Sequence, residues 1–236
     1  MGHPGEADGL RDYEDDLRDA RGCLLEAGGQ VGDALDAGEV PVLVAGHCPV
    51  CLATLPAVLE RHPDARVLWL DAHADFNTPE TTPSRFLGGM CLAGACGLWD
   101  SGFEGDVQPE RVVLAGVRDL DEGEQRLVAG TGARVVGVST ATAARAVAAL
   151  EGAPVFIHLD LDVLDNAIVP AEFPAKGGLS LAALADVLAG VGAASEILGI
   201  EITCFPAPDA VADGEGLAAT ISDAVAGLLE KGTNAS

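Results

Sequence analysis

Six short apolar segments, each rich in Val, Leu and Ile, alternate with helical segments along most of the chain. This alternation constrains the fold more than any other feature, because such strands separated by helices are typical of a parallel sheet covered on both faces. The sequence therefore predicts an α/β fold with three layers, α/β/α, around a mostly parallel sheet. The expected strands are Val40–Val44, Arg66–Leu70, Arg111–Ala115, Arg134–Val138, Pro154–Leu159 and Leu198–Thr203, and the expected helices are roughly Val50–Arg61, Met90–Gly97, Glu122–Ala129, Thr140–Leu150, Leu181–Val191 and Gly214–Glu230.

The chain length of 236 residues suits a single domain, 1–236, because no repeat, low-complexity tract or long linker divides it. Residues 1–38 are polar, contain no predicted strand, and are interpreted as a helical N-terminal extension of one or two helices. Two long irregular segments, Phe76–Gly88 and Val163–Leu179, each follow a predicted strand. Loops of this length are usually functional, and these two should lie at the carboxyl edge of the sheet, where α/β proteins bind ligands.

The formal net charge of −24 disfavours nucleic acid and anionic membranes as partners, because their phosphates would be repelled. The same charge would attract a metal cation or a cationic small molecule, although acidic surfaces also simply confer solubility. The apolar runs are too short for a transmembrane helix, and the acidic N-terminus lacks the pattern of a signal peptide. A cytoplasmic protein is therefore expected.

The strongest chemical signal is the segment Asp71-Ala72-His73-Ala74-Asp75, which follows a predicted strand directly. If the strand continues through it, the alternation of side chains places Asp71, His73 and Asp75 on one face. Carboxylates at such short range repel each other unless a cation lies between them. A solvated acidic loop with an incidental histidine is the weaker interpretation, because the segment follows a buried apolar run.

A second acidic pair, Asp160 and Asp162, follows the predicted strand Pro154–Leu159. One such pair is weak evidence by itself, but two acidic strand ends in one parallel sheet are more specific. Four carboxylates and one imidazole form an oxygen-rich donor set suited to Mn²⁺ or a similar divalent ion. Because four carboxylates exceed what one divalent ion needs for neutrality, two bridged ions are favoured, and such a pair can activate a water molecule.

Three segments in this order resemble the arginase–agmatinase (ureohydrolase) family. They are residues 71–84 (DAHADFNTPETTPS), 116–124 (GVRDLDEGE) and 158–171 (HLDLDVLDNAIVPA), and the similarity extends from about Val40 to about Thr203. The resemblance implies an arginase-like fold, two divalent metal ions, most commonly Mn²⁺, and hydrolysis of a C–N bond in a guanidino compound.

The resemblance also implies metal-binding roles for individual residues. Asp71 and Asp160 would bridge the two ions, Asp75 would complete one of them, and His73 with Asp162 would complete the other. Asp75 and Asp162 are also the expected catalytic residues, with Asp75 helping to stabilise the tetrahedral intermediate.

Four further positions match places that bind substrate in arginases. Asn77 and Ser84 match positions that contact the substrate's α-carboxylate, and Asp119 and Asp121 match acidic positions near its α-amino group. The alternative is that these four residues form a loop that caps the next helix, as Asn, Ser and Asp readily do.

The sequence departs from the family at four places. Cys48 stands where the family usually has a histidine ligand, as in some bacterial arginase-like proteins, and we expect its thiolate to bind metal while His47 stays outside the ligand set. Gly88 stands where arginases have a proton-shuttle histidine, which a hydroxyguanidine with its better leaving group would need less. Cys204 stands at the position where the family has the glutamate that contacts the guanidinium, and Glu201, two to three residues away, is interpreted as structural. The usual first strand of the fold is not apparent before Val40.

The segment Cys48-Pro49-Val50-Cys51 supports a competing interpretation as a thioredoxin-type redox site or half of a structural zinc site. No second cysteine pair of suitable spacing follows, and Cys51 fits the apolar face of the helix that it begins.

The sequence thus predicts a binuclear metal hydrolase of a guanidino or N-hydroxyguanidino compound that releases urea or hydroxyurea. The alternatives are a metal-binding protein without catalytic activity, with a binding or regulatory role, and a dithiol redox protein. The exact substrate stays open, as does the formation of a homo-oligomer.

Overall fold

The computed structural model describes residues 11–105, 107–206, 211 and 213–232. In this part of the chain, six parallel strands form the middle layer, in the order β1-β6-β5-β2-β3-β4. Each strand is short and apolar, as the sequence predicts. Their bounds are β1 Val42–Val44, β2 Arg66–Leu70, β3 Val112–Ala115, β4 Arg134–Val136, β5 Val155–Asp160 and β6 Ile197–Thr203.

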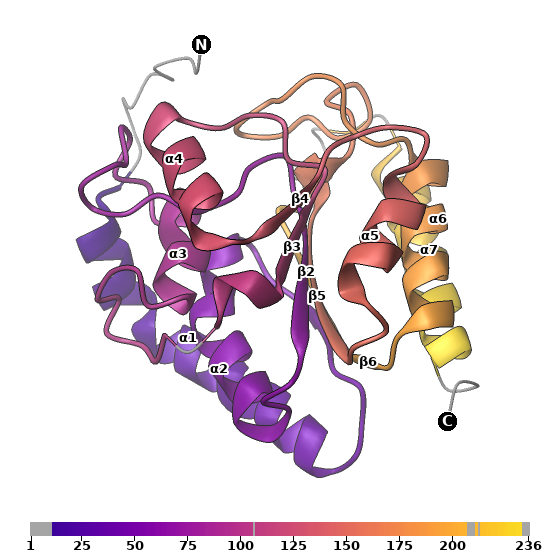
Figure 1. The fold of residues 1–236 in the computed structure, drawn as a ribbon, viewed down its shortest axis with the longest axis horizontal. Coiled ribbons are helices and arrows are strands. Elements are labelled where there is room, and N and C mark those ends of the chain that lie inside the picture. The colour runs from indigo at the N-terminus through magenta and orange to yellow at the C-terminus, as the bar shows by residue number, and fades with distance from the viewer. Residues whose placement is uncertain (1–10, 106, 207–210, 212, 233–236) are drawn as a thin grey trace.

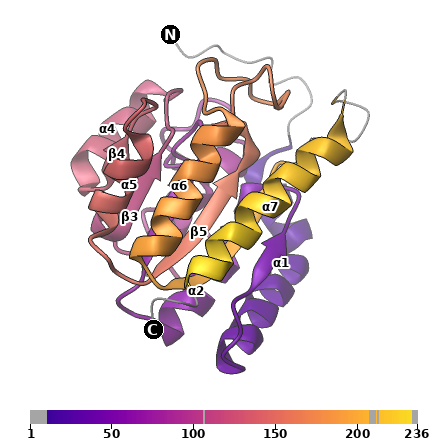
Figure 2. The ribbon, with the colours of Figure 1, turned by 90° about the vertical axis from the view of Figure 1, so that its right-hand side faces the viewer.

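Helices cover both faces of the sheet (Figure 1). One face packs against α1 to α4, which contribute Val31, Leu52, Leu92 and Val128 to its core, and the other packs against α5 to α7 (Figure 2). The predicted three-layer α/β/α fold is therefore confirmed. The helices are α1 Tyr13–Asp36, α2 Cys51–Arg61, α3 Cys91–Ala95, α4 Glu122–Thr131, α5 Thr142–Leu150, α6 Leu181–Ala194 and α7 Gly214–Gly232, with short 3₁₀ turns at Cys48–Val50, Gly88–Met90, Pro109–Arg111 and Leu161–Val163.

The strand order places a switch point between β2 and β5. From β2 the chain builds outward through β3 and β4, and it then returns to the other side of β2 for β5. Helices leave neighbouring strands in opposite directions at such a point, so a crevice opens at the carboxyl ends of the two strands. Leu70 pairs with Leu159 in the register, so Asp71 and Asp160 come next to each other at that crevice.

Strand β2 spans Arg66–Leu70, as predicted, and does not continue through Asp75, so the condition for placing Asp71, His73 and Asp75 on one face of a strand is not met. Residues 71–73 bend, and Asp75 has a left-handed backbone with φ 53°. The side chains of Asp71, His73 and Asp75 are therefore placed by a turning loop and not by strand alternation.

Other segments follow the predictions with shifted bounds. A single helix, α1, spans most of residues 11–38, and the described residues before β1 contain no strand. The helix expected at Met90–Gly97 is shorter, Cys91–Ala95, and a 3₁₀ turn precedes it. The two long segments after β2 and β5 have no regular structure beyond short turns and one isolated bridge, between Leu164 and Leu179. No helix in the described residues is long and apolar enough to cross a membrane.

Candidate metal centre

Four aspartates lie buried at the carboxyl ends of β2 and β5. Asp71 is 1% exposed, Asp160 3%, Asp75 5% and Asp162 7%. Burial and the neighbouring Asp162 raise the pKa of Asp71 well above its ordinary value, and burial together with Asp162 also raises the pKa of Asp160. Charged carboxylates at this density are stable only beside a compensating cation.

His73 lies between two of these carboxylates. Its Nδ1 is 3.3 Å from Oδ1 of Asp71 and 3.1 Å from Oδ2 of Asp162. Burial lowers the pKa of His73, but the hydrogen bonds to Asp162 and Asp71 outweigh it and raise the pKa to about 12. Backbone N–H groups hold the same carboxylates, since Ala72 donates to Asp162 and His73 donates to Asp71. Asp71, His73 and Asp162 thus form one compact group of potential metal ligands.

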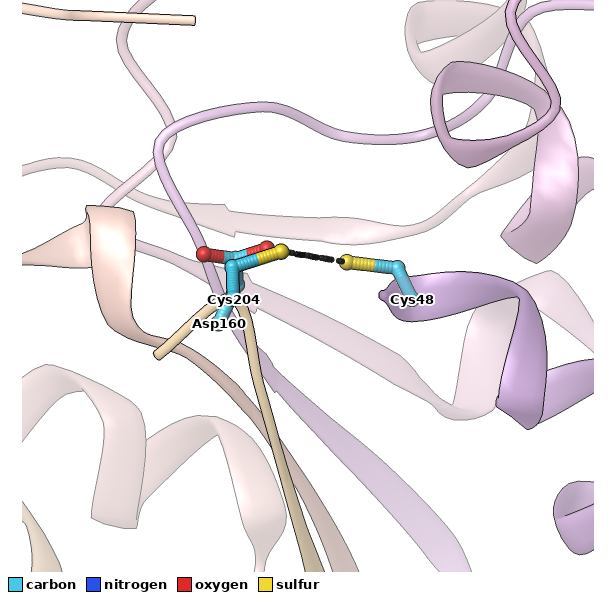
Figure 3. Close-up of side chains that lie close together, drawn as sticks. All are labelled: Cys48, Asp160 and Cys204. Atoms are coloured by element: carbon cyan, nitrogen blue, oxygen red, sulfur yellow. Dashed lines mark hydrogen bonds between the residues drawn. The ribbon is translucent and has the colours of Figure 1, made fainter. Parts of the chain in front are cut away.

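A second group consists of Cys48, Asp160 and Cys204 (Figure 3). Cys48 begins the 3₁₀ turn before α2, and its Sγ donates to Oδ2 of Asp160 at 2.9 Å. Cys204 follows β6, and its Sγ is 3.9 Å from that of Cys48. The neighbouring Cys204, burial and Asp160 raise the pKa of the Cys48 thiol well above its ordinary value. The ligand atom of Cys48 also lies within reach of Asp71 and His158, so the two groups adjoin.

Asp75 lies outside these two groups. Its carboxylate accepts a hydrogen bond from the Cys91 thiol at 3.6 Å, and it belongs to none of the compact ligand groups among the described residues. Burial raises its pKa well above the ordinary value, with further contributions from Asp160 and Asp162, so it lies close enough to interact with them electrostatically. Its predicted role as a ligand remains a prediction.

His158 is a buried site residue that the sequence reasoning missed. Its ring stacks on Trp69, with centroids 3.5 Å apart, and its Nδ1 lies 2.7 Å from Oε1 of Glu201. Trp69 donates to Asp71 at 3.0 Å, and the other carboxylate oxygen of Glu201 accepts from Thr54 at 2.6 Å. The available signal was strand parity, because His158 lies two residues before Asp160 and therefore on the same face of β5. Glu201 is fully buried in this network, which agrees with the structural role suggested for it.

The four predicted substrate residues separate into two groups. Asn77 donates to Asp121 at 3.1 Å, and Asp121 caps α4 in a capping box with Glu124. This arrangement matches the helix-capping alternative for Asn77 and Asp121. Ser84 accepts from the backbone of Phe86, and Asp119 is exposed. The structure therefore joins only Asn77 and Asp121 directly.

The two long loops meet beside His73. Phe86 and Phe173 lie 5.1 Å apart between ring centroids, and Phe173 lies 6.4 Å from the His73 ring. His47 is exposed and contacts Phe86, in agreement with its expected place outside the ligand set. Gly88 is buried, and a side chain there would collide with the ring of Phe86.

The two cysteines of the CPVC segment, Cys48 and Cys51, are both free thiols, and they lie in different surroundings. Cys51 is fully buried in the core beside Leu52 and Leu55. Burial raises the pKa of its thiol, although a hydrogen bond with Cys91 acts in the opposite direction. Cys48 instead contacts Asp160, Thr203 and Cys204.

Comparisons with known proteins agree with this geometry. The Arginase family profile matches residues 10–226. The chain belongs to the arginase family. It is 42% identical to N(omega)-hydroxy-L-arginine amidinohydrolase of Streptomyces lavendulae over 91% of this chain and 78% of that protein, and 32% identical to the arginase of Bacillus caldovelox over 75% and 66%. The crystal structure of the Bacillus caldovelox arginase superposes with a TM-score of 0.80 and 27% identity, covering 93% of this chain and 77% of that one.

Membership in the arginase family confirms two predictions, the fold and the reaction class. This arginase-family chain is a hydrolase that acts on C–N bonds of linear amidines. The family depends on divalent metal, and the buried groups around Asp71 and Asp160 contain the oxygen and imidazole ligands that such ions prefer. The donor set of this chain therefore fits the family's metal chemistry.

Proposed function

We propose that this chain is a binuclear, Mn²⁺-dependent amidinohydrolase of an N-hydroxyguanidino compound related to arginine. The observation that carries the proposal is the pair of adjoining ligand groups at the ends of β2 and β5. The 42% identity of the chain to N(omega)-hydroxy-L-arginine amidinohydrolase supports the choice of substrate class.

Each buried side chain has a proposed task in the reaction. Asp71 and Asp160 would bridge the two ions, Asp75 and Cys48 would complete one, and His73 and Asp162 would complete the other. When bound, the ions supply positive charge that polarises the substrate and makes water a stronger nucleophile at neutral pH. Asp75 and Asp162 would orient the attacking water, and Asp75 would help to stabilise the tetrahedral intermediate.

Gly88 stands at the shuttle position. It has no side chain that could pass a proton to the leaving group, and the ring of Phe86 fills the space that a larger residue would need. The bond to the alkyl nitrogen breaks in the release of both urea and hydroxyurea, so the leaving amine is the same for both substrates. The choice of substrate class therefore rests on the similarity to N(omega)-hydroxy-L-arginine amidinohydrolase, and on this basis hydroxyurea should be released faster from N-hydroxyarginine than urea is from arginine.

Asn77, Ser84, Asp119 and Asp121 are proposed to bind the amino-acid end of the substrate. Ser84 and Asp119 are the better candidates, because the side chains of Asn77 and Asp121 already bond to each other. The proposal includes a cytoplasmic location and leaves open a homo-oligomer.

The test combines metal analysis with a substrate screen. The protein is prepared with Mn²⁺ and assayed against N-hydroxyarginine, arginine, agmatine and guanidinobutyrate, with detection of hydroxyurea and urea. Asp160→Asn should abolish both metal retention and turnover, whereas Asp186→Asn on the exposed face of α6 should change neither. Turnover that survives Asp160→Asn would place the active site elsewhere.

A metal-binding protein without catalytic activity is the second candidate, favoured by Gly88 and by Cys204 in the place of the family's glutamate. Full metal occupancy with no turnover of any substrate in the screen would support it.

A further inference from the structure

The segments that carry Cys48 and Cys204 are joined beyond the ends of their strands. Val44 pairs with Ile202 in the register of β1 and β6. The pairing continues past the strands, because the backbone N–H of Ala45 donates to Ile202 and that of Cys204 donates to Gly46 at 3.2 Å. These bonds hold the two cysteines opposite each other, with their sulfurs directed toward one another (Figure 3) and that of Cys48 bonded to Asp160.

The backbone of Cys204 is held in an uncommon conformation. Its φ of 58° lies in the left-handed region, which a residue with a side chain rarely adopts at no cost. Asp75 is the other residue near the centre with this conformation. Left-handed backbone at a non-glycine residue persists where the surrounding structure requires it, and here it aims the sulfur at Cys48 and Asp160.

The distance between the sulfurs fits two ligands of one ion. Two thiolates bound at about 2.3 Å with a near-tetrahedral angle lie about 3.8 Å apart. The observed Sγ–Sγ distance is 3.9 Å. A disulfide of about 2.05 Å would require the sulfurs to approach by almost 2 Å. The Asp160 oxygen would have to move away from the Cys48 sulfur. The two atoms are 2.9 Å apart, whereas an oxygen and a sulfur bound to one ion would lie about 3.5 Å apart.

We propose that Cys204 is a second thiolate ligand at the position of Cys48 and Asp160, which makes this position selective for a thiophilic divalent ion such as Zn²⁺. The group of Asp71, His73 and Asp162 contains no sulfur and offers the oxygen and imidazole ligands that suit Mn²⁺. The centre is then heterobimetallic, with a soft and a hard position that share the bridging aspartates. This inference rests on the proposed function only for the presence of two ions.

The experiment uses Co²⁺ as the probe, because cobalt bound to thiolate absorbs in the near ultraviolet by charge transfer. The full chain is reduced with a phosphine, loaded with Co²⁺ and compared with Cys204→Ser, Cys48→Ser and the exposed control Cys23→Ser. Each of the first two variants should lose about half of the absorption, and the control should keep all of it. Dialysis against Mn²⁺ in large excess over Zn²⁺ should leave about one of each ion on the wild-type chain and less zinc on Cys204→Ser.

Cys204→Gly separates ligation from folding. Glycine adopts a left-handed φ without strain, so this variant should fold at least as well as the wild type, and circular dichroism verifies it. It should nevertheless lose the same half of the cobalt absorption. A folded Cys204→Gly variant with the full wild-type band would overturn the proposal.

Failure of this inference is distinguishable from failure of the proposed function. Hydrolysis of N-hydroxyarginine with a cobalt spectrum that does not depend on Cys204 would refute the second thiolate alone. A halved band in a protein that hydrolyses none of the guanidines would support the thiolate and refute the amidinohydrolase.

Discussion

At the scale of single residues, Glu124 shows how a buried acid supports the centre without belonging to it. Its carboxylate accepts hydrogen bonds from the backbone of Phe76 at 3.0 Å and of Asp121 at 3.3 Å. It thereby fixes the backbone just after Asp75 and the start of α4 together. Burial raises the pKa of Glu124 to about 7, although these two hydrogen bonds act in the opposite direction.

Glu124 should make stability depend on pH. Because its pKa in the folded state is about 7 and its ordinary value is 4.5, the folded protein keeps a proton that the unfolded chain releases in this range. Stability from this group therefore falls as the pH rises from 4.5 and is lost fully above 7. The free energy of unfolding of Glu124→Gln, relative to that of the wild type, should therefore rise by about 3 kcal/mol as the pH increases through this range, at about 1.36 kcal/mol per pKa unit. Urea unfolding at several pH values measures this, and a difference that stays constant with pH would contradict it.

Single residues also show what the sequence could reveal. Asp71 and Asp160 were predictable because each follows an apolar strand, and parallel strands end at one edge. The contact of Cys204 with Cys48 was not predictable, because it depends on β6 lying between β1 and β5. The backbone turn at Asp75 was also hidden, since no glycine or asparagine marks its left-handed φ.

At the scale of elements, the docking of α1 on α2 depends on a close approach at Gly28. A Cβ at this position would lie 2.6 Å from the carbonyl oxygen of Ala53, whereas one on the neighbouring Gly29 would meet no atom within 4 Å. Both glycines lie in the middle of the same helix, so they differ mainly in what they face.

This pair gives a matched prediction. Gly29→Ala should stabilise the protein by about 0.5–1 kcal/mol through helix propensity. Gly28→Ala should destabilise it by about 1–3 kcal/mol, because the methyl group forces the two helices apart. Thermal or urea unfolding of both variants tests the packing, and equal gains in stability would show that α1 does not dock closely.

Arg118 anchors the long loop that follows β5. Its guanidinium donates only to backbone carbonyls, and these belong to Gly116, Asp162, Val163, Leu164, Ala175 and Lys176. One side chain thus ties both ends of the loop to the segment after β3. Arg118 lies inside a segment that resembles the family, but no role could be predicted for it. Its partners are backbone carbonyls, which every residue carries, so no pattern of residue types indicates the contact.

Arg118→Lys should loosen this loop, because an ammonium cannot reach so many carbonyls at once. Hydrogen bonds from charged groups contribute about 1.5–3 kcal/mol each, so amide exchange in residues 164–179 should accelerate by roughly tenfold or more. Arg145→Lys, on the exposed face of α5, is the control and should leave exchange unchanged. Unchanged protection in the Arg118→Lys variant would mean that the loop is held by other contacts.

At the scale of the whole molecule, the buried aspartates oppose folding until a cation binds them. Binding to the folded state alone at a concentration of about 100 Kd adds about 2.7 kcal/mol of stability. For a chain of this size, that corresponds to a rise in Tm of roughly 5–10 °C with Mn²⁺. A chelator should reverse the rise, and Asp160→Asn should abolish it. A Tm that does not respond to any divalent ion would argue against the centre.

The sequence predicted the three layers well at this scale, since the alternation of strands and helices is a local pattern. The shape of the centre was harder to predict, because it depends on loop backbone and on strand order.

The separation of Cys48 and Cys204 by 156 positions has a consequence for biosynthesis. A ribosome delivers β2 and β5, with Asp71, His73 and Asp162, before it delivers β6. The oxygen-and-imidazole position can therefore assemble on the growing chain while the sulfur-containing position still lacks Cys204, one of its proposed ligands. Zinc bound too early would meet only one thiol, and manganese would meet its full set of ligands. With the proposed pair of ions, the order of translation would give the hard ion the first opportunity to bind.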